Sequence, residues 1–259
     1  MSLINPSSLR DVDKLAGQYA NAGPFPHLVI DDFLPLETAQ LIHDEARHTM
    51  LNVDASNDVT QKYKRACTEW TQFGDQTANL IAYFNSALFI SQLERITALD
   101  GVFGDPWIEG GGIHVTSRGG FLKMHTDFNW HAKLRADRRI NILYYLNRDW
   151  RPDYGGSLRI QRLGQSEEKV IDPVFNRLVI FNTNDTTLHG HPEPLDFPDD
   201  YPRVSIAMYY YTSGLNVAER FRSKATTTRY LPRHTGDIAL TSGSLRSRLG
   251  YLFRRFSRF

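Results

Sequence analysis

The sequence contains a single cysteine, Cys67, among its 259 residues. One cysteine excludes an internal disulfide and a cysteine-rich zinc site, and it favours a reducing compartment. A charge excess of one sign is also lacking, because 30 Lys and Arg residues balance 29 Asp and Glu residues for a net charge of +1. Proteins that bind nucleic acid through its backbone usually have a clear basic excess. We therefore expect no nucleic-acid partner.

Long hydrophobic runs are lacking as well. The least charged stretch, residues 76–93, is interrupted by Asn79, Asn85, Ser86 and Ser91, so it is not predicted to cross a membrane. The N-terminus shows no basic start followed by an apolar run, and it therefore predicts no signal peptide. We expect a cytoplasmic protein.

Apolar residues make up 41% of the chain and aromatic residues 12%, enough for a sizeable core. The first hundred residues predict one strand over 27–33 and at least two helices. One helix opens at Pro35, and a second is expected over 75–99 with Asp75 as its N-cap. Apolar residues at helical spacing predict the buried face of this second helix: Leu80, Ile81, Phe84 and Leu88.

The composition of the sequence changes at about Ile108. Short runs rich in β-branched and aromatic residues now alternate with Gly, Pro, Asn and Asp, and they read IHVTS, FLKMHTDF, INILYYLN, SLRIQR, RLVIFN and VSIAMYYYT. Several short strands with turn signals between them predict an antiparallel sandwich or barrel. We expect a single domain over 1–214, with a helical flank (1–105) and a β-core (106–213), followed by a basic C-terminal extension over 215–259.

Two histidines and one aspartate of the β-core are candidate metal ligands. His125 and Asp127 lie two positions apart, so on a strand both side chains point to one face. Such a pair indicates little by itself. A later polar segment, however, ends in the sequence His189-Gly-His191-Pro. Two histidines and a carboxylate can hold a metal on one triangular face and leave three positions open, as non-haem Fe(II) oxygenases require.

Arg203 is a charged residue in an otherwise apolar strand of the β-core. It alternates with Ser205, Ala207 and Tyr209 on one face of an apolar strand. An arginine on an inward face is costly unless it meets an anion; the alternative is that it lies at the strand end and points to solvent. A 2-oxo acid bound to the metal would present a distal carboxylate to this guanidinium, with Tyr145 and Ser205 as additional hydrogen-bond donors.

At these positions the sequence resembles the Fe(II)- and 2-oxoglutarate-dependent dioxygenase superfamily, prolyl 4-hydroxylase type. The resemblance covers about 100 residues, from Gly111 to Thr212, and the segment PFPHLVIDDFLP (24–35) also looks like the entry segment of such enzymes. The matching motifs arrive in one order: HTD (125–127), YYLN (144–147), GGSL (155–158), NRLVIF (176–181), HGHP (189–192) and RVSIAMYYY (203–211).

The resemblance implies a mainly β fold with flanking helices around a double-stranded β-helix, also called a jelly-roll or cupin-like core. It implies that His125, Asp127 and His189 hold iron, that Arg203 binds the distal carboxylate of 2-oxoglutarate, and that Tyr145 and Ser205 assist. The implied reaction is hydroxylation of an unactivated C–H bond with release of succinate and CO₂, with ascorbate supporting the assay in vitro. A prolyl residue of a peptide or a small molecule would be the substrate.

The sequence leaves several alternatives open for the site residues and for the function. His191 rivals His189 as the third ligand, and His114 either lines the pocket or is a hydrogen-bonded barrel residue. Arg139 and Asn141 alternate with Tyr145, and both are candidates to face the cavity. Two other classes of function fit the same residues: a catalytically silent β-barrel binding or sensing module, and a zinc hydrolase, for which His₂-carboxylate is also a suitable ligand set.

The end of the extension predicts a basic amphipathic helix. Apolar residues recur there at spacings of three and four, accompanied by five arginines and no acidic residue. Such a helix could lie peripherally on an anionic membrane surface, dock on a partner or a second subunit, or pack on its own domain. The apolar residues are Leu245, Leu249, Leu252, Phe256 and Phe259.

Overall fold

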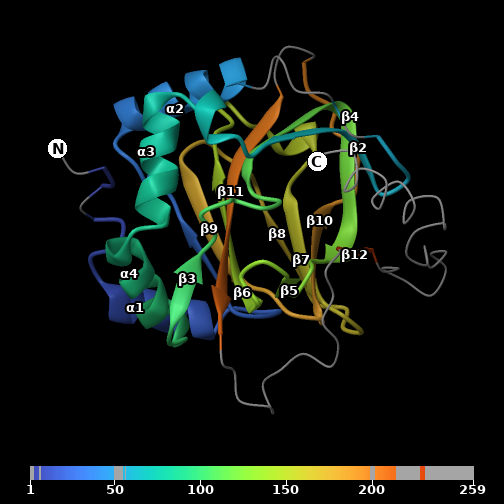
Figure 1. Ribbon diagram of the computed structural model, residues 1–259. Helices are drawn as coiled ribbons and strands as arrows, with labels where there is room; N and C mark the ends of the chain where they lie inside the picture. The colour runs from blue at the N-terminus through green and yellow to red at the C-terminus, as the bar shows by residue number, and fades with distance from the viewer. Residues whose placement is uncertain are drawn as a thin grey trace, which may run out of the picture.

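The computed structural model describes residues 3–5, 7–49, 55, 57–198, 202–213 and 228–230. Its helices are α1 (Val12–Ala20), α2 (Leu36–Thr49), α3 (Asp75–Phe84) and α4 (Ala87–Thr97), with short 3-10 turns η2 (Trp70–Gln72) and η3 (Pro152–Tyr154). Its strands are β1 (His27–Ile30), β2 (Gln61–Cys67), β3 (Val102–Gly104), β4 (Gly112–Thr126), β5 (Trp130–His131), β6 (Ala136–Tyr145), β7 (Leu158–Arg162), β8 (Glu168–Ile171), β9 (Arg177–Asn182), β10 (Thr187–His191), β11 (Arg203–Thr212) and β12 (Arg229–Tyr230) (Figure 1).

The long strand β4 connects two halves of a curled antiparallel sheet. Its first half, residues 112–116, pairs with β11, which continues the sheet through β6 and β9 to β1. Its second half pairs with β10, which continues through β7 to β8. The curled sheet is the double-stranded β-helix of a jelly roll, so the predicted fold class is confirmed.

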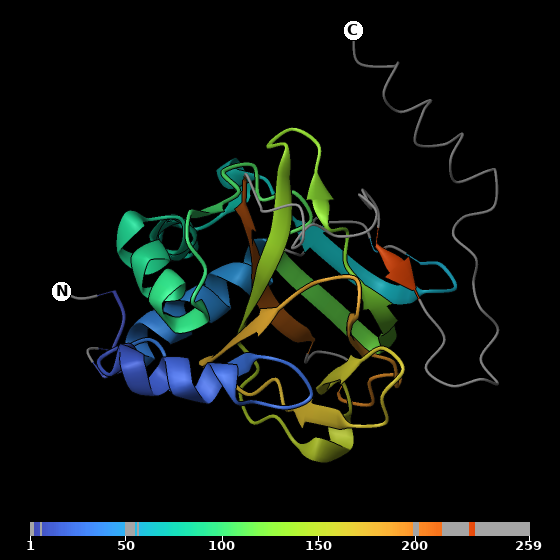
Figure 2. The same ribbon diagram turned by 90° about the horizontal axis from the view of Figure 1, so that it is seen from below.

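The helices gather on one side of the curled sheet, where they buttress its larger half (Figures 1 and 2). Their apolar faces form one continuous core with strands β6, β9 and β11. In this layer the Phe33 ring stacks on Phe84, and Phe84 meets Phe89 edge to face. The Tyr210 hydroxyl of β11 donates a hydrogen bond to the Phe84 carbonyl at 3.0 Å. This packing leaves the opposite face of the larger half-sheet open to the cavity.

The single helix expected over 75–99 is in fact two helices. α3 ends with Asn85 as its C-cap, and α4 starts with Ser86 as its N-cap, whose hydroxyl accepts a hydrogen bond from the Phe89 amide. The break changes the helical phase, so Leu88 is 64% exposed while Phe84 is fully buried. The N-cap of α3 is Gly74 rather than Asp75, which is the first helical residue.

The flank over 1–105 is less purely helical than predicted. Besides β1, it contributes β2 and β3, which join the sheet at β4 and β11. β2 escaped prediction because the sequence QKYKRAC lacks apolar alternation. Its side chains that face the sheet interior include a lysine, and only pairing with the distant β4 makes this segment a strand.

The C-terminal extension is described only at residues 228–230, where β12 pairs with β4 at Thr126 and His125. The predicted amphipathic helix lies outside the described residues. Within the part of the chain that the structure describes, no helix is long and apolar enough to cross a membrane.

Candidate functional site

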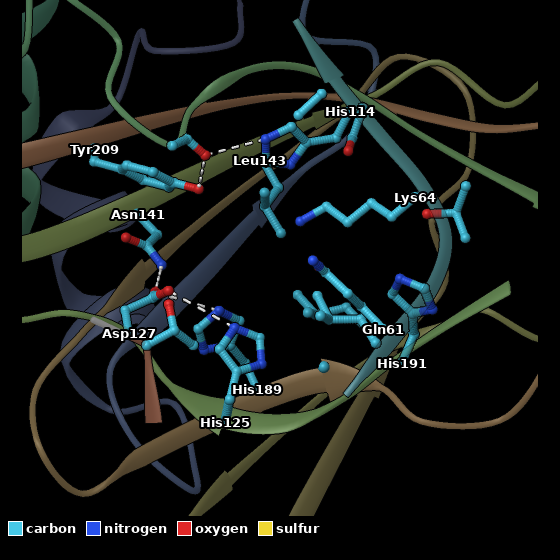
Figure 3. A pocket seen from close by; sticks show the side chains of 18 of the residues that line it. Gln61, Lys64, His114, His125, Asp127, Asn141, Leu143, His189, His191 and Tyr209 are labelled. Carbon is cyan, nitrogen blue, oxygen red and sulfur yellow. Dashed lines mark hydrogen bonds and ion pairs between the residues drawn. The ribbon is translucent and has the colours of Figure 1, made fainter. Parts of the chain in front are cut away.

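A cavity of about 320 Å³ opens between the two halves of the curled sheet. Its described walls are formed by residues of β2, β4, β6 and β11 and by residues of β7 and β10. Figure 3 shows several of these side chains pointing towards one another. Strand alternation explains which side chains enter it, since every second residue of each strand faces the interior. His125, Asp127, His189, Arg203 and Ser205 all line this cavity, as predicted.

The three predicted metal ligands lie together at one end of the cavity. His125 on β4 and His189 on β10 are cross-strand neighbours with ring centroids 4.3 Å apart. The Asp127 carboxylate lies 3.7 Å from Nε2 of His125 and 3.3 Å from Nε2 of His189. All three side chains are buried, and one ligand atom of each lies within 4.8 Å of the others. Two imidazoles and one carboxylate at this spacing suit a divalent transition metal.

Close approach of β10 to β4 requires the glycine between the two histidines of the HGH motif. A Cβ atom on Gly190 would lie 2.7 Å from the Leu122 carbonyl oxygen and 2.8 Å from that of Lys123. Any larger residue would therefore push β10 away from β4 and separate the cross-strand ligand pair.

The two histidines of the triad, His125 and His189, are held in the neutral state. Nδ1 of His125 lies 2.8 Å from the Lys123 carbonyl, a contact that directs Nε2 towards the other ligands. Burial lowers the pKa of His125 and lowers the pKa of His189 to about 3, against the opposing effect of Asp127. Both rings are therefore neutral at neutral pH, so their Nε2 lone pairs are available to a metal ion.

Arg138 and Asn141 of β6 hold the Asp127 carboxylate. The Asn141 amide donates a hydrogen bond to Oδ2 at 2.7 Å, and a terminal nitrogen of Arg138 lies 2.9 Å from the same oxygen. The Arg138 guanidinium lies between the rings of Tyr209 and Phe128, at 3.4 and 4.6 Å from their centroids. Burial alone would raise the pKa of Asp127, but Arg138 and the neighbouring groups hold it well below its ordinary value. Asp127 is thus ionised and ready to bind a cation.

Arg138 was missed by sequence reasoning, which proposed Arg139 instead. Strict alternation from Tyr145 predicts Asn141 and Arg139 on the cavity face, and Asn141 is indeed there. A register shift places Ile140 opposite Tyr210 but Arg138 opposite Tyr211, so Arg139 is the extra residue of a β-bulge. The bulge reverses the alternation before Ile140, and Arg138 rather than Arg139 enters the cavity.

Arg203 forms a second polar centre in the same cavity. Its side chain is only 6% exposed, which excludes the alternative that it points to solvent. Nε donates to the Gly156 carbonyl at 2.8 Å, and a terminal nitrogen donates to the Tyr145 hydroxyl at 3.2 Å. These bonds use two of the five N–H donors and fix the plane of the fork. Ser205 lies one inward position farther along β11 and also lines the cavity.

The other candidate histidines have separate places. His191 lines the cavity, but it does not belong to the triad that brings His125, Asp127 and His189 together. His114 also lines the cavity while one of its ring nitrogens lies 3.1 Å from the Gly110 carbonyl, so both of its expected roles apply. Burial lowers the pKa of both residues well below the ordinary histidine value.

Part of the C-terminal extension also reaches the site. The Tyr230 ring lies 5.2 Å from the His125 ring, and Thr228 and Tyr230 line the cavity. No local pattern in the sequence could have indicated these residues, because they reach the cavity only by pairing with a strand a hundred positions earlier.

The region that forms this site is similar to a known protein family. Residues 111–211 match the sequence profile of the 2OG-Fe(II) oxygenase superfamily. The match covers the β-core that carries the cavity, which is less than half of the chain. The matched region starts before β4 and ends in β11, so it contains all three triad residues and Arg203. The resemblance inferred from the motifs is confirmed.

Solved structures share the fold of this chain at low sequence identity. A prolyl-4-hydroxylase of Pseudomonas putida is 16% identical with a TM-score of 0.59, over 78% of this chain and 100% of its own. A prolyl hydroxylase of Trichoplax adhaerens, solved with a hypoxia inducible factor peptide fragment, is 18% identical with a TM-score of 0.54, over 78% and 91%. HygX of Streptomyces hygroscopicus, solved with nickel, 2-oxoglutarate and hygromycin B, is 12% identical with a TM-score of 0.50, over 73% and 84%.

Proposed function

We propose that the protein is an Fe(II)- and 2-oxoglutarate-dependent dioxygenase that hydroxylates an unactivated C–H bond. The observation that carries this proposal is the presence of two complementary centres in one buried cavity. One centre is the neutral His₂-carboxylate triad, which suits Fe(II), and the other is the buried Arg203 guanidinium, which suits a carboxylate. Metal and cosubstrate would bridge these two centres.

The residues present would divide the work as follows. His125, Asp127 and His189 would hold the metal, and Arg138 would keep the Asp127 carboxylate ionised and oriented. Arg203 would bind the distal carboxylate of 2-oxoglutarate, with the Tyr145 hydroxyl fixing the plane of its guanidinium. The bound Fe(II) and 2-oxoglutarate supply the oxidative chemistry, in which O₂ converts 2-oxoglutarate to succinate and CO₂ and hydroxylates the substrate. The protein would contribute the geometry of the site and its charge complementarity.

The class of substrate follows from the size of the cavity and from the structural neighbours. About 320 Å³ is at the small end of ligand pockets, so the cosubstrate and only the reacting part of a substrate fill it. The Trichoplax enzyme was solved with a peptide fragment and HygX with hygromycin B, so neighbours of this fold accept both peptides and small molecules. A prolyl residue or a small molecule of similar size is the substrate we propose.

The lining of the cavity disfavours a zinc hydrolase. Asp127 is the single carboxylate among the described lining residues, and Arg138 and Asn141 already engage it. A hydrolase would need a further acid or base beside the metal-bound water. Loss of a ligand would support the silent-module alternative, and all three candidate ligands are present and close together.

Cosubstrate turnover tests the proposal without knowledge of the substrate. The purified protein is incubated with Fe(II), ascorbate, O₂ and 2-oxoglutarate, and succinate and CO₂ are quantified. Slow but metal-dependent release of both products in equal amounts is the expected result, abolished in His189→Ala. Absence of succinate from a protein that binds Fe(II) tightly would contradict the proposal and favour the binding-module alternative.

A further inference from the structure

Lys64 is a cavity residue for which the proposed chemistry has no use. It lies on β2, the strand of the N-terminal flank that extends the larger half-sheet beyond β4, and its side chain projects into the cavity (Figure 3). Lys64 pairs with Thr116, and Thr116 pairs on its other side with Arg203. The two basic residues therefore belong to one cross-strand row and face the same interior, separated by the width of β4.

The ammonium of Lys64 is partly withdrawn from water. Burial lowers the pKa of Lys64 to about 8, against the raising effect of Asp127 and together with the lowering effects of Arg203 and Arg138. These interactions place Lys64 within electrostatic range of both the metal end and the Arg203 end of the cavity. An ammonium group has three N–H donors, and in a cavity it can form a charge-assisted hydrogen bond to an anionic ligand.

The described side chains that line the cavity carry more positive than negative charge. Among the described lining residues there are three cationic side chains, Lys64, Arg138 and Arg203, and a single carboxylate, Asp127. Fe(II) and dianionic 2-oxoglutarate would cancel each other's charge on binding. The described lining would therefore still carry an excess of positive charge, which attracts an anionic substrate and repels a cationic one.

We propose that Lys64 is a specificity-determining residue that binds a carboxylate of the substrate beside the reacting C–H bond. This inference rests on the proposed oxygenase function and names the class of its substrate: a small carboxylic acid or the free carboxyl end of a peptide. The two carboxylates of 2-oxoglutarate are already assigned, one to the metal and one to Arg203. Across the strand β4 from Arg203, Lys64 is placed to receive a third carboxylate.

The test compares matched acids and amides. Wild-type protein is loaded anaerobically with Fe(II) and 2-oxoglutarate, and it is titrated with N-acetyl amino acids and with the corresponding N-acetyl amino-acid amides. Binding is followed by the perturbation of the visible absorption band and by equilibrium dialysis. At least one acid should bind about tenfold more tightly than its amide, the order of magnitude of one charge-assisted hydrogen bond.

Three variants assign that preference to the residue. Lys64→Met should abolish the preference for the acid, Lys64→Arg should retain most of it, and all variants should bind 2-oxoglutarate within about twofold of wild type. Lys62→Met is the matched control, because Lys62 lies on the same strand but is exposed and does not line the cavity. It should behave as wild type.

Three results would overturn the inference. These are an acid preference that persists in Lys64→Met, no acid preference in wild type for any pair, and a parallel loss of 2-oxoglutarate affinity in Lys64→Met. The last would assign Lys64 to the cosubstrate instead. Failure of the wild-type protein to form the visible band with Fe(II) and 2-oxoglutarate would, by contrast, contradict the oxygenase function itself, so the two failures are distinguishable.

Discussion

The ionisation of Asp127 depends on the neighbouring guanidinium of Arg138, which lowers the pKa of the carboxylate. Arg138→Met keeps an apolar side chain between Phe128 and Tyr209 but removes the positive charge beside the carboxylate. The pKa of Asp127 should then rise, so that acid displaces the metal at a higher pH than in wild type. Metal affinity at neutral pH should also fall, by about 10-fold to 100-fold, as is usual when a residue that supports a ligand is lost.

Equilibrium dialysis with Fe(II) over a series of pH values measures both effects of Arg138→Met. Arg138→Lys should recover part of the loss because it restores the charge without the planar fork. Arg139→Met is the matched control, since the bulge places Arg139 outside the cavity. Identical pH profiles for Arg138→Met and wild type would show that Arg138 does not control Asp127.

The second prediction at the scale of residues concerns Arg203. Arg203→Ala should weaken binding of 2-oxoglutarate by about 10-fold to 100-fold, the equivalent of one lost hydrogen-bonded charge pair, while Fe(II) affinity stays within about twofold. Calorimetric titration of the metal-loaded protein with 2-oxoglutarate measures this change. Arg159→Ala, which removes an arginine of β7 that does not line the cavity, should leave the affinity unchanged. Equal losses in the two variants would place the cosubstrate elsewhere.

Individual cavity residues could be placed from sequence where alternation on a strand is undisturbed. His125, Asp127, Tyr145, Arg203 and Ser205 follow this pattern, and the structure brings all of them to the predicted cavity or to its wall. Arg138 could not be predicted, because one bulge residue reverses the alternation and nothing in the local sequence marks the bulge. Lys64 and Tyr230 escaped for a different reason: each depends on pairing with a distant strand.

At the scale of elements, α3 stabilises the β-helix from outside. Phe84 is fully buried against Phe33 and Phe89, whereas Leu88 at the start of α4 is 64% exposed. Phe84→Ala should lower the free energy of unfolding by about 3–5 kcal/mol, the cost of a cavity in a packed core. Leu88→Ala, the matched control four residues later, should change it by less than about 0.5 kcal/mol.

Chemical denaturation of the two variants measures the difference. Equal effects would mean that the helices pack on the sheet in a different phase. The same pair shows the limit of helical periodicity as a predictor. Spacing alone places Phe84 and Leu88 on one face, but Asn85 and Ser86 end one helix and begin another. Capping residues inside an apolar pattern can therefore mark a helix boundary that the regular spacing of apolar residues hides.

At the scale of the whole molecule, buried histidines couple stability to pH. Burial lowers the pKa of all four cavity histidines below the ordinary value of about 6.5: His114, His125, His189 and His191. The unfolded chain therefore binds protons that the folded chain does not, so the free energy of unfolding falls as the pH drops below about 6.5. Each histidine contributes up to about 1.4 kcal/mol per pH unit until its pKa in the folded state is reached.

Urea unfolding of the metal-free protein between pH 7.5 and 5 measures this loss. Stability should be nearly constant above pH 7 and should decline steeply below about pH 6.5. Saturating Fe(II) should raise the stability and steepen the decline, because protons then compete with the metal for its ligands. A flat profile down to pH 5 would show that the four rings take up protons in the folded state.

The overall fold was easier to predict from the sequence than the way in which distant strands close the cavity. Regularly spaced short strands after Ile108 are enough to indicate an antiparallel barrel or sandwich, and the family resemblance carried by the motifs implies the double-stranded β-helix. The closure of the cavity by β2 and β12 could not be foreseen, since these strands are short and polar and acquire their conformation only from β4. The sequence therefore predicts the metal and cosubstrate end of the cavity better than the wall that selects the substrate.

The central claim is that one cavity holds Fe(II) and 2-oxoglutarate together, and an anaerobic titration tests it most directly. Metal-free protein receives one equivalent of Fe(II) and then increasing 2-oxoglutarate, and the visible spectrum is recorded. A new metal-to-ligand charge-transfer band is expected, which saturates with 2-oxoglutarate and is absent in His189→Ala. Tight binding of Fe(II) with no band at any concentration of 2-oxoglutarate would contradict the account, because the triad would then serve a different chemistry.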